Sequence, residues 1–307
     1  MTTAFIFPGQ GSQSVGMGAA LIERFAEAAE VYHQADEALG FELSSLILQG
    51  PLERLTETEN TQPAILTCAV AYLRVLQKHG VQAQLAAGHS LGEYAALVAN
   101  GALDFPTAVK LVRLRGRYMQ AAVPLGVGTM TAVLMLDGPK VEALCEEVST
   151  SDSRVEPAGY NSPGQLACAG HVEAVERLEA AVGKAGGMAK RLNVSAPFHS
   201  SLLQKAGDDL GLALADVQIA PLQFPYVANV DAQLVNDTDG VKQRLIEQVM
   251  KPVRWEQSVA TMRAAGVERF IEVGPGKTLA GLLRKVDRKL NVVSVDDSKA
   301  FEALLAG

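Results

Sequence analysis

Residues 88–92 constrain the fold of this chain more than any other stretch, because they place a Gly-x-Ser-x-Gly turn between two apolar segments. The short apolar run 85–87 precedes the turn and the helical pattern of 93–99 follows it, which predicts a strand, a tight turn and a helix. Glycine on each side lets the backbone turn sharply without Cβ clashes. The turn directs the free N–H groups of the helix N-terminus towards the Ser90 hydroxyl. We interpret Ser90 as a candidate nucleophile; a Gly/Ser turn without chemistry is the alternative.

The rest of the chain alternates strand and helix patterns on both sides of this turn. Residues 4–7 predict a buried strand, and helical periodicity covers 17–39 and 62–78. Asp104 is the expected N-cap of a third long helix that ends before Pro124. From residue 199 onward, helical segments alternate with strands around 224–227, 269–273 and 292–295. Alternating βα elements predict a parallel sheet that is covered on both faces.

The middle of the chain follows a different pattern. Its strand-like and helical segments alternate as strand, helix, strand, strand, helix, strand, at 130–136, 139–148, 155–160, 165–169, 171–185 and 188–194. This βαββαβ order is that of the ferredoxin-like unit. We therefore predict an α/β core made of residues 1–124 and 197–307, with residues 125–196 inserted as a small ferredoxin-like α+β subdomain.

Composition excludes several classes of function. A formal net charge of -7 argues against a nucleic-acid partner. The apolar runs are too short or too charged to cross a membrane, and residues 1–4 lack the basic region of a signal peptide. The three cysteines, Cys68, Cys145 and Cys168, have no metal-binding or redox spacing. An odd number of cysteines without an export signal predicts reduced thiols in a cytoplasm.

A serine nucleophile needs a base, and His199 is the histidine left after the others are considered. The chain has five histidines. The four that we set aside lie on solvent-facing helix positions, at a helix start, or beside Ser90 but directed away from it: His33, His79, His171 and His89. His199 begins a helix where the inserted segment returns to the core, and clefts form at such junctions. A helix-start residue without chemistry is the alternative for His199.

No acid follows Ser90 in the pattern of a hydrolase triad. Asp104, Asp137 and Asp152 have the surroundings of cap or turn residues. We therefore expect a Ser–His pair whose histidine is oriented by a backbone carbonyl at a helix C-terminus, where carbonyls lack intrahelical partners. The helix that ends at 247–250, just before Pro252, is a candidate for that role.

The third long helix carries an arginine on its apolar side. Its apolar residues form one stripe at helical spacing: Ala108, Leu111, Val112, Tyr118, Met119 and Ala122. Arg115 falls inside this stripe, whereas Arg113 and Arg117 lie on roughly the opposite face. An inward-facing cation needs a partner. That partner is either a carboxylate of the protein or the carboxylate of a substrate, which an arginine can bind in a bidentate manner; the sequence leaves both open.

Eight motifs now form a recognisable series. In order they are Phe-Pro-Gly-Gln-Gly-Ser-Gln at 7–13, Thr-Gln-Pro-Ala at 61–64, Gly-His-Ser-Leu-Gly-Glu-Tyr at 88–94, Arg-Gly-Arg-Tyr-Met-Gln at 115–120, Asn-Ser-Pro-Gly-Gln at 161–165, Phe-His at 198–199, Pro-Val-Arg-Trp at 252–255 and Glu-Val-Gly-Pro-Gly at 272–276. Together they cover nearly the whole chain. The sequence resembles the malonyl-CoA:acyl carrier protein transacylases of bacterial type II fatty acid synthesis.

The resemblance implies an α/β-hydrolase-like core with a ferredoxin-like insertion, and it implies roles for particular residues. It implies Ser90 as nucleophile, His199 as base, the backbone N–H groups of Gln10 and Leu91 as the oxyanion hole, and Arg115 as the clamp for the malonyl carboxylate. It also implies that the Gln248 carbonyl orients His199. Gln62 and Asn161 match motif positions near the substrate, and Phe198 resembles the malonyl-selective form of its motif.

The function implied is transfer of malonyl from malonyl-CoA to the phosphopantetheine thiol of acyl carrier protein, through a malonyl-serine and without metal or redox cofactor. We expect a cytoplasmic enzyme, favour a monomer, and expect the acidic carrier to meet Lys190 and Arg191 or the cluster Arg284, Lys285, Arg288 and Lys289. A serine thioesterase or hydrolase is the main alternative. A polyketide acyltransferase is the second, although a chain ending at Gly307 without further segments favours a freestanding enzyme; a non-catalytic binding module is the third.

Overall fold

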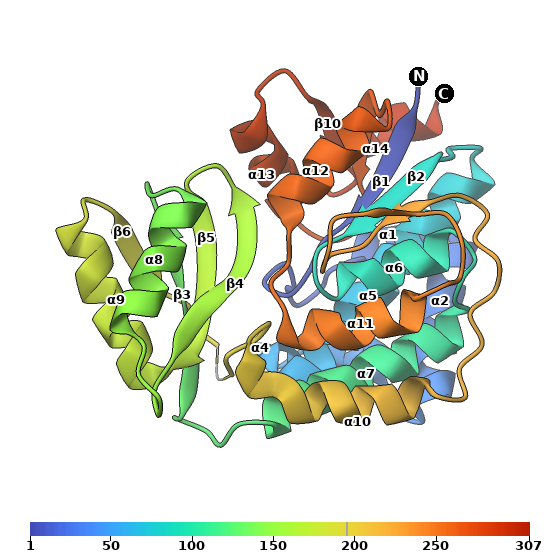
Figure 1. Cartoon of the computed structure of the whole chain (residues 1–307). Coiled ribbons are helices and arrows are strands. Elements are labelled where there is room, and N and C mark those ends of the chain that lie inside the picture. Colours follow the sequence, from blue (N-terminus) through green and yellow to red (C-terminus); the bar gives the residue numbers. More distant parts are fainter. Residues whose placement is uncertain (195) are drawn as a thin grey trace.

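Two β-sheets lie beside each other in the computed structural model, which describes residues 1–194 and 196–307 (Figure 1). Among the described residues the larger sheet has six strands in the order β10-β9-β1-β2-β7-β8. Its strands are β1 Thr3–Phe7, β2 Leu85–Gly88, β7 Tyr226–Val227, β8 Leu234–Val235, β9 Arg269–Glu272 and β10 Asn291–Ser294. All neighbours in this sheet are parallel except β7 and β8. The predicted parallel α/β core is therefore confirmed.

Strand β1 shows why helices must cover both faces of the large sheet. Phe5 and Phe7 point to one face and join the core formed with the long helices, whereas Ala4 and Ile6 point to the other and join a second core. Apolar side chains on both faces are expected of a buried parallel strand. The register pairs Phe7 with Gly88, so β1 and β2 end side by side.

The helices divide between these two faces. Helices α12 Trp255–Ala264 and α13 Thr278–Val286 contribute to the core beside Ala4 and Ile6. The other helices of the larger part are α1 Ala19–Arg24, α2 Ala26–Leu39, α3 Leu43–Gln49, α4 Leu52–Thr56, α5 Thr58–Lys78, α6 Gly92–Ala99, α7 Phe105–Ala121, α10 Gln204–Leu214, α11 Val241–Met250 and α14 Ser298–Leu305. A 3₁₀ turn, η1 Ser201–Leu203, precedes α10. In Figure 1 the two chain termini lie close together at the top.

The smaller sheet has its own hydrophobic core. Its antiparallel strands follow the order β4-β5-β3-β6 among the described residues, as in the ferredoxin-like unit. They are β3 Gly128–Leu134, β4 Val155–Ser162, β5 Gln165–His171 and β6 Met188–Arg191. Helices α8 Gly138–Val148 and α9 Val172–Lys184 pack on one face of it. The subdomain boundaries at 125 and 196 stay a prediction, and Ser195 within that range lies outside the described residues.

Several predicted element bounds are wrong. The helix predicted over 17–39 is two helices, because Phe25 adopts an extended conformation (φ -128°, ψ 113°) and its ring packs edge-on against His79 and Phe301. Helix α5 begins at Thr58 rather than at 62. The strands expected at 224–227 and 188–194 are shorter, at Tyr226–Val227 and Met188–Arg191, and β8 was not predicted. No described helix combines the length and hydropathy that crossing a bilayer requires.

Candidate active site

Ser90 occupies the sharp turn between β2 and α6. Its φ of 54° lies in the left-handed region, which non-glycine residues adopt rarely and chiefly at functional sites. The flanking glycines allow the backbone segments to approach each other. A Cβ on Gly88 would lie 1.9 Å from the backbone carbon of Gly92, and a Cβ on Gly92 would lie 2.2 Å from the Phe7 oxygen. The turn therefore depends on both glycines of the motif.

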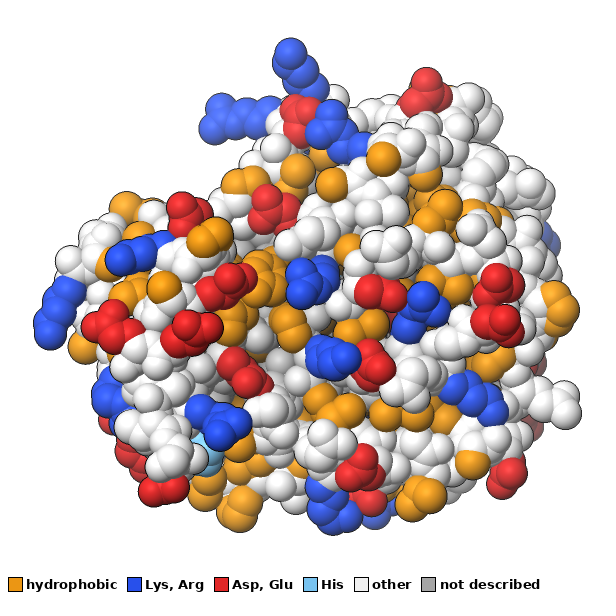
Figure 2. Space-filling view, in the orientation of Figure 1, with side chains coloured by type: hydrophobic (Ala, Val, Ile, Leu, Met, Phe, Trp, Pro, Cys, Tyr) orange, Lys and Arg blue, Asp and Glu red, His pale blue; other side chains and the backbone are white. Residues whose placement is uncertain are grey.

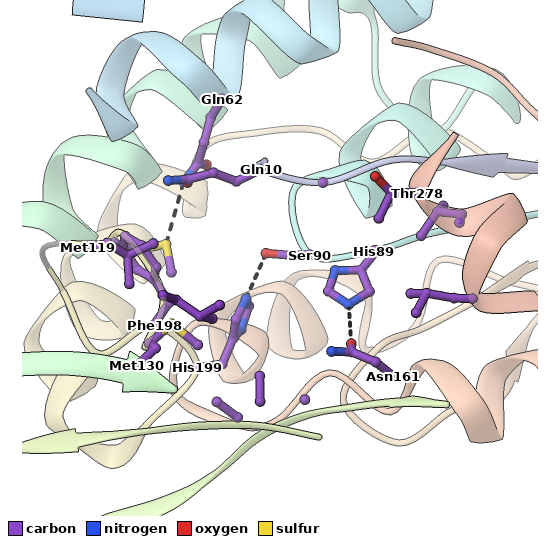
Figure 3. A pocket seen from close by; sticks show the side chains of 18 of the residues that line it. Gln10, Gln62, His89, Ser90, Met119, Met130, Asn161, Phe198, His199 and Thr278 are labelled. Carbon is purple, nitrogen blue, oxygen red and sulfur yellow. Dashed lines mark hydrogen bonds between the residues drawn. The ribbon is translucent and has the colours of Figure 1, made fainter. Parts of the chain in front are cut away.

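His199 lies between Ser90 and Gln248. Its Nε2 is 2.7 Å from Ser90 Oγ (Figure 3). Its Nδ1 is 2.7 Å from the backbone oxygen of Gln248, near the end of α11. A carbonyl oxygen can only accept, so Nδ1 carries the proton of the neutral ring. Nε2 then accepts a hydrogen bond from the Ser90 hydroxyl. His199 itself lies in a turn just before η1, with a φ of 59°.

The surroundings of His199 keep its imidazole neutral. Burial, followed by the positive charge of Arg115, lowers its pKa to about 3, and the hydrogen bond to Gln248 opposes this shift only in part. A neutral ring at physiological pH can accept the proton of Ser90. Ser90 and His199 therefore have the geometry that a nucleophile and its base require.

Arg115 on α7 is buried, with 1% of its surface exposed. Its Nη1 donates to Gln62 Oε1 at 2.7 Å, and its Nη2 donates to Gln248 Oε1 at 2.8 Å and to Ser90 Oγ at 3.1 Å. Among the described residues no carboxylate lies within ion-pair distance of it. The structure therefore does not provide the internal ion pair, and a guanidinium bound only by neutral oxygens remains beside the serine.

A cavity of about 330 Å³ opens above Ser90, between the two sheets. Six of the predicted site residues line it: Ser90, His199, Gln10, Arg115, Gln62 and Asn161. Its apolar wall includes Met119 from α7 and Met130 from β3 (Figure 3). Leu91 and Gln248 do not line the cavity. A mainly apolar pocket with a few convergent polar groups is the usual form of a small-molecule site.

The backbone N–H groups of Gln10 and Leu91 are available to a ligand. Neither donates to an acceptor within the part of the chain that the structure describes. Gln10 lies in the loop after β1, and Leu91 directly follows Ser90 at the start of α6. Because β1 and β2 end side by side, the two segments meet at the same edge of the sheet. Two such amides near a nucleophile can hold a developing oxyanion.

Gln62 and Asn161 occupy different parts of the cavity. Gln62 on α5 accepts from Arg115, and its Nε2 lies 3.7 Å from Met119 Sδ. Asn161 on β4 lies 3.0 Å from His89 Nε2, on the side of the turn away from His199 (Figure 3). His89 thus points away from Ser90, as predicted. The pair His89 and Asn161 connects the serine turn to the smaller sheet.

Two buried residues behind the serine, Glu93 and Asn229, were not predicted from the sequence. Asn229 Oδ1 accepts from the Ser90 N–H at 2.7 Å, and its Nδ2 donates to the Gly88 oxygen at 2.6 Å. Glu93 Oε2 accepts from Gln248 Nε2 at 2.7 Å and from the Asn229 N–H at 3.1 Å. A carboxylate within the otherwise apolar 93–99 segment was a signal for Glu93. For Asn229, the only signal in the sequence was its position just after a short strand.

The residues set aside as candidates take structural positions. Asp104 and Asp137 cap α7 and α8 by accepting from the N–H groups of Thr107 and Lys140. His33 and His79 are exposed. The cysteines Cys68, Cys145 and Cys168 are buried free thiols. No group of three or more His, Cys, Asp or Glu side chains suited to a metal ion occurs among the described residues.

Known proteins match this chain over almost its entire length. The family model for the acyl transferase domain matches residues 4–299. A malonyl CoA-acyl carrier protein transacylase of Escherichia coli O157:H7 is 45% identical over 306 residues, which cover 98% of each chain. The corresponding protein of Bacillus subtilis strain 168 is 44% identical over 302 residues, covering 97% of this chain and 95% of its own.

Solved structures agree with the sequence relatives. The malonyl CoA-acyl carrier protein transacylase of Clostridium perfringens superposes with a TM-score of 0.96 at 40% identity, covering 100% of this chain and 96% of its own. A malonyl-transacylase in complex with a type II polyketide synthase acyl-carrier protein also has a TM-score of 0.96 at 40% identity, covering 100% and 99%. Together with the serine turn and the contacts around it, these matches show that the chain belongs to the acyl transferase family, within the group of malonyl CoA-acyl carrier protein transacylases.

Proposed function

We propose that this chain transfers the malonyl group from malonyl-CoA to the phosphopantetheine thiol of an acyl carrier protein. The observation that carries the proposal is Arg115, a buried guanidinium that donates to Ser90 Oγ at 3.1 Å and has no carboxylate partner in the described residues. A substrate with a free carboxylate supplies the missing partner. The names of the relatives, and the carrier held by one of them, support both substrates.

The first half-reaction forms a malonyl-serine. His199 Nε2 takes the Ser90 proton while Oγ attacks the thioester carbonyl, and the backbone N–H groups of Gln10 and Leu91 stabilise the oxyanion. The carbon–sulfur bond then breaks, and the protonated imidazole returns its proton to the departing coenzyme A thiolate. The Gln248 oxygen holds His199 in the orientation that this proton transfer requires.

The second half-reaction repeats this chemistry with a different thiol. The phosphopantetheine thiol of the carrier gives its proton to His199 and attacks the serine ester, and the Ser90 oxygen regains a proton as it leaves. Arg115 holds the malonyl carboxylate through both steps, so the reacting carbonyl stays in place. Ping-pong kinetics follow from the covalent intermediate.

Further properties belong to the same proposal. The transfer needs no metal or redox cofactor, because serine, histidine and two amides supply the nucleophile, base and oxyanion stabilisation. One chain supplies every residue that the mechanism uses, so the proposal needs no second subunit and a monomer is the expected form. Its buried free thiols support a reducing cytoplasm. Residues 125–196 act as the subdomain that closes one side of the cavity, and 1–124 with 197–307 as the catalytic core.

The experiment measures intact mass after mixing the protein with malonyl-CoA. We expect a malonyl adduct on the wild type, its transfer to holo carrier protein, and no adduct on Ser90→Ala, with peptide mapping that locates the group on Ser90. Malonic acid released without an adduct would indicate the hydrolase alternative. A malonyl group mapped to Ser200 or Ser201 would contradict Ser90 as the nucleophile.

A further inference from the structure

Glu93 and Arg115 contact opposite ends of one amide. Gln248 Oε1 accepts from Arg115 Nη2 at 2.8 Å, and Gln248 Nε2 donates to Glu93 Oε2 at 2.7 Å. Both charged side chains and the amide are buried, with at most 1% of their surface exposed. Glu93 Oε1 has no hydrogen-bond partner among the described residues. A cation, an amide and a carboxylate therefore form one buried row behind Ser90.

The other charged groups near Glu93 compensate each other or stay neutral. Asp231, after β7, is paired with Arg244 of α11 at 2.9 Å. Burial raises the pKa of both nearby tyrosines, Tyr94 of α6 and Tyr226 of β7, well above the physiological range. Strands β1 and β2 and helix α5, which also pack against α6, present no charged group to Glu93 among the described residues. Before a substrate binds, Glu93 is thus the carboxylate among the described residues that offsets the charge of Arg115.

This arrangement changes when the substrate carboxylate binds Arg115. The buried region then contains one guanidinium and two carboxylates, and an uncompensated buried anion is costly. Glu93 can remove that excess by taking up a proton, and its free Oε1 can carry it. We propose that Glu93 is a positioning residue which takes up a proton when the malonyl carboxylate reaches Arg115. Glu93 is then the counter-charge of Arg115 before malonyl binds, and the malonyl carboxylate is the counter-charge afterwards. The inference rests on the proposed function, in which Arg115 binds malonyl.

The carboxyl of Glu93 titrates in the range where such an exchange is observable. Burial raises its pKa to about 7, and the hydrogen bonds from Gln248 and Asn229 oppose this shift. A second carboxylate nearby raises a carboxyl pKa further, by about one unit or more. With a rise of about one unit, uptake is roughly half a proton near pH 7.5, and malonyl affinity falls about tenfold between pH 6 and pH 9. His199, with a pKa of about 3, stays neutral over this range.

The experiment counts protons by titration calorimetry in buffers of different ionisation enthalpy. All proteins carry Ser90→Ala, so that malonyl-CoA binds without reacting. We expect roughly half a proton taken up per malonyl-CoA at pH 7.5, beyond the value for acetyl-CoA. Acetyl-CoA carries the same phosphates, so the difference isolates the free carboxylate. Adding Glu93→Gln should abolish that difference and flatten the pH dependence of malonyl affinity.

Glu272 offers a matched control. It is also buried with a pKa raised to about 7 by burial, but its oxygens accept from the N–H groups of Leu279 and Ala280 in α13 and it does not contact Gln248. Glu272→Gln should therefore retain the proton uptake. If Glu93→Gln does not fold, the infrared difference spectrum of the parent protein with malonyl-CoA should still gain a protonated-carboxyl band.

Two results would overturn the inference: equal proton uptake with malonyl-CoA and acetyl-CoA, or uptake that survives Glu93→Gln. Either result leaves the proposed function standing if the wild type still forms a malonyl-serine by intact mass. Failure of that adduct would instead refute the proposed function, so the two failures are distinguishable.

Discussion

The backbone oxygen of Gln248 accepts a hydrogen bond from His199 Nδ1 at 2.7 Å, at the position where a Ser-His-Asp triad has a carboxylate. A neutral carbonyl stabilises an imidazolium less than a carboxylate does. Burial, followed by the positive charge of Arg115, disfavours the imidazolium more than this hydrogen bond stabilises it, so the pKa of His199 falls to about 3. In the proposed mechanism, His199 is therefore neutral and able to accept a proton at any pH near neutrality.

This relationship predicts the acidic limb of the pH–rate profile. Activity requires neutral His199, so kcat/KM should fall only as the pH drops through the lowered pKa, well below 6.5. Replacing Arg115 with Gln removes a positive charge beside His199, so the limb should move to higher pH. We would measure kcat/KM for acetyl-CoA, which does not need the guanidinium, in both proteins. An acidic limb that stays at the same pH in Arg115→Gln would contradict this interpretation.

The base itself can be tested by His199→Ala. Loss of a general base should slow both half-reactions by about 10²-fold or more. Rapid-quench experiments read by intact mass separate the rate of acylation by malonyl-CoA from the rate of transfer to the carrier. His33→Ala, at an exposed helix position, is the matched control and should react at the wild-type rate. A His199→Ala protein that keeps the acidic limb would show that another group is the base.

Arg115 should determine which acyl group is accepted. In Arg115→Ala the malonyl carboxylate loses its buried partner, so kcat/KM for malonyl-CoA should fall by the equivalent of about 2–5 kcal/mol. A neutral acetyl group leaves the wild-type guanidinium unpaired, so acetyl-CoA should lose little or improve. The ratio of kcat/KM for the two thioesters is the measurement. An equal loss on both substrates would show that Arg115 has a structural role instead.

The serine turn should be sensitive to a single added methyl group. A Cβ on Gly92 would lie 2.2 Å from the Phe7 oxygen, a backbone atom that cannot move without shifting β1. Gly92→Ala should lower the free energy of unfolding by about 1–3 kcal/mol or more. A Cβ on Gly183 in α9 would meet no neighbouring atom within 4 Å, so Gly183→Ala should be neutral or stabilise by up to about 1 kcal/mol. Denaturant unfolding compares the two, and equal stabilities would contradict the steric argument.

Carrier docking should involve the basic end of α13. Figure 2 shows Lys and Arg side chains projecting at the top, where Figure 1 places the turn between α13 and β10. Lys285 Nζ donates to Gln165 Oε1 at 2.6 Å, and Gln165 lines the cavity, so Lys285 near the end of α13 lies beside the cavity. On β6, by contrast, Arg191 is already paired with Glu179 at 2.8 Å.

We therefore expect Arg288→Glu with Lys289→Glu to raise KM for the carrier, most strongly at low salt. Malonyl-serine formation from malonyl-CoA should change less, which separates carrier docking from coenzyme A binding. Lys190→Glu on β6 is the control, because it also replaces one positive charge with a negative charge. An unchanged KM for the carrier in the double variant would exclude this surface.

The sequence by itself determined the features that depend on local pattern. The glycines around Ser90 predicted the turn, because only a sharp bend needs small residues at both positions. The helical stripe around Arg115 predicted its burial, because side chains at that spacing share one face. Alternating strand and helix patterns predicted a parallel core and a separate antiparallel sheet. The bounds of the helices and strands were less predictable. Phe25 interrupts a continuous helical pattern because its ring packs against His79 and Phe301, which lie on distant segments of the chain.

Only the tertiary structure decided what the buried polar groups contact. The sequence did not decide whether the partner of Arg115 is a protein carboxylate or a substrate carboxylate. The fold surrounds Arg115 with the neutral oxygens of Gln62, Gln248 and Ser90. The fold also brings Glu93 into contact with Gln248, although the two residues lie 155 positions apart in the sequence. Helical and strand periodicity reports which face of an element is buried, because it depends on neighbouring residues. A hydrogen bond depends on distances of a few ångströms between segments far apart in the chain, and packing of the whole core sets those distances.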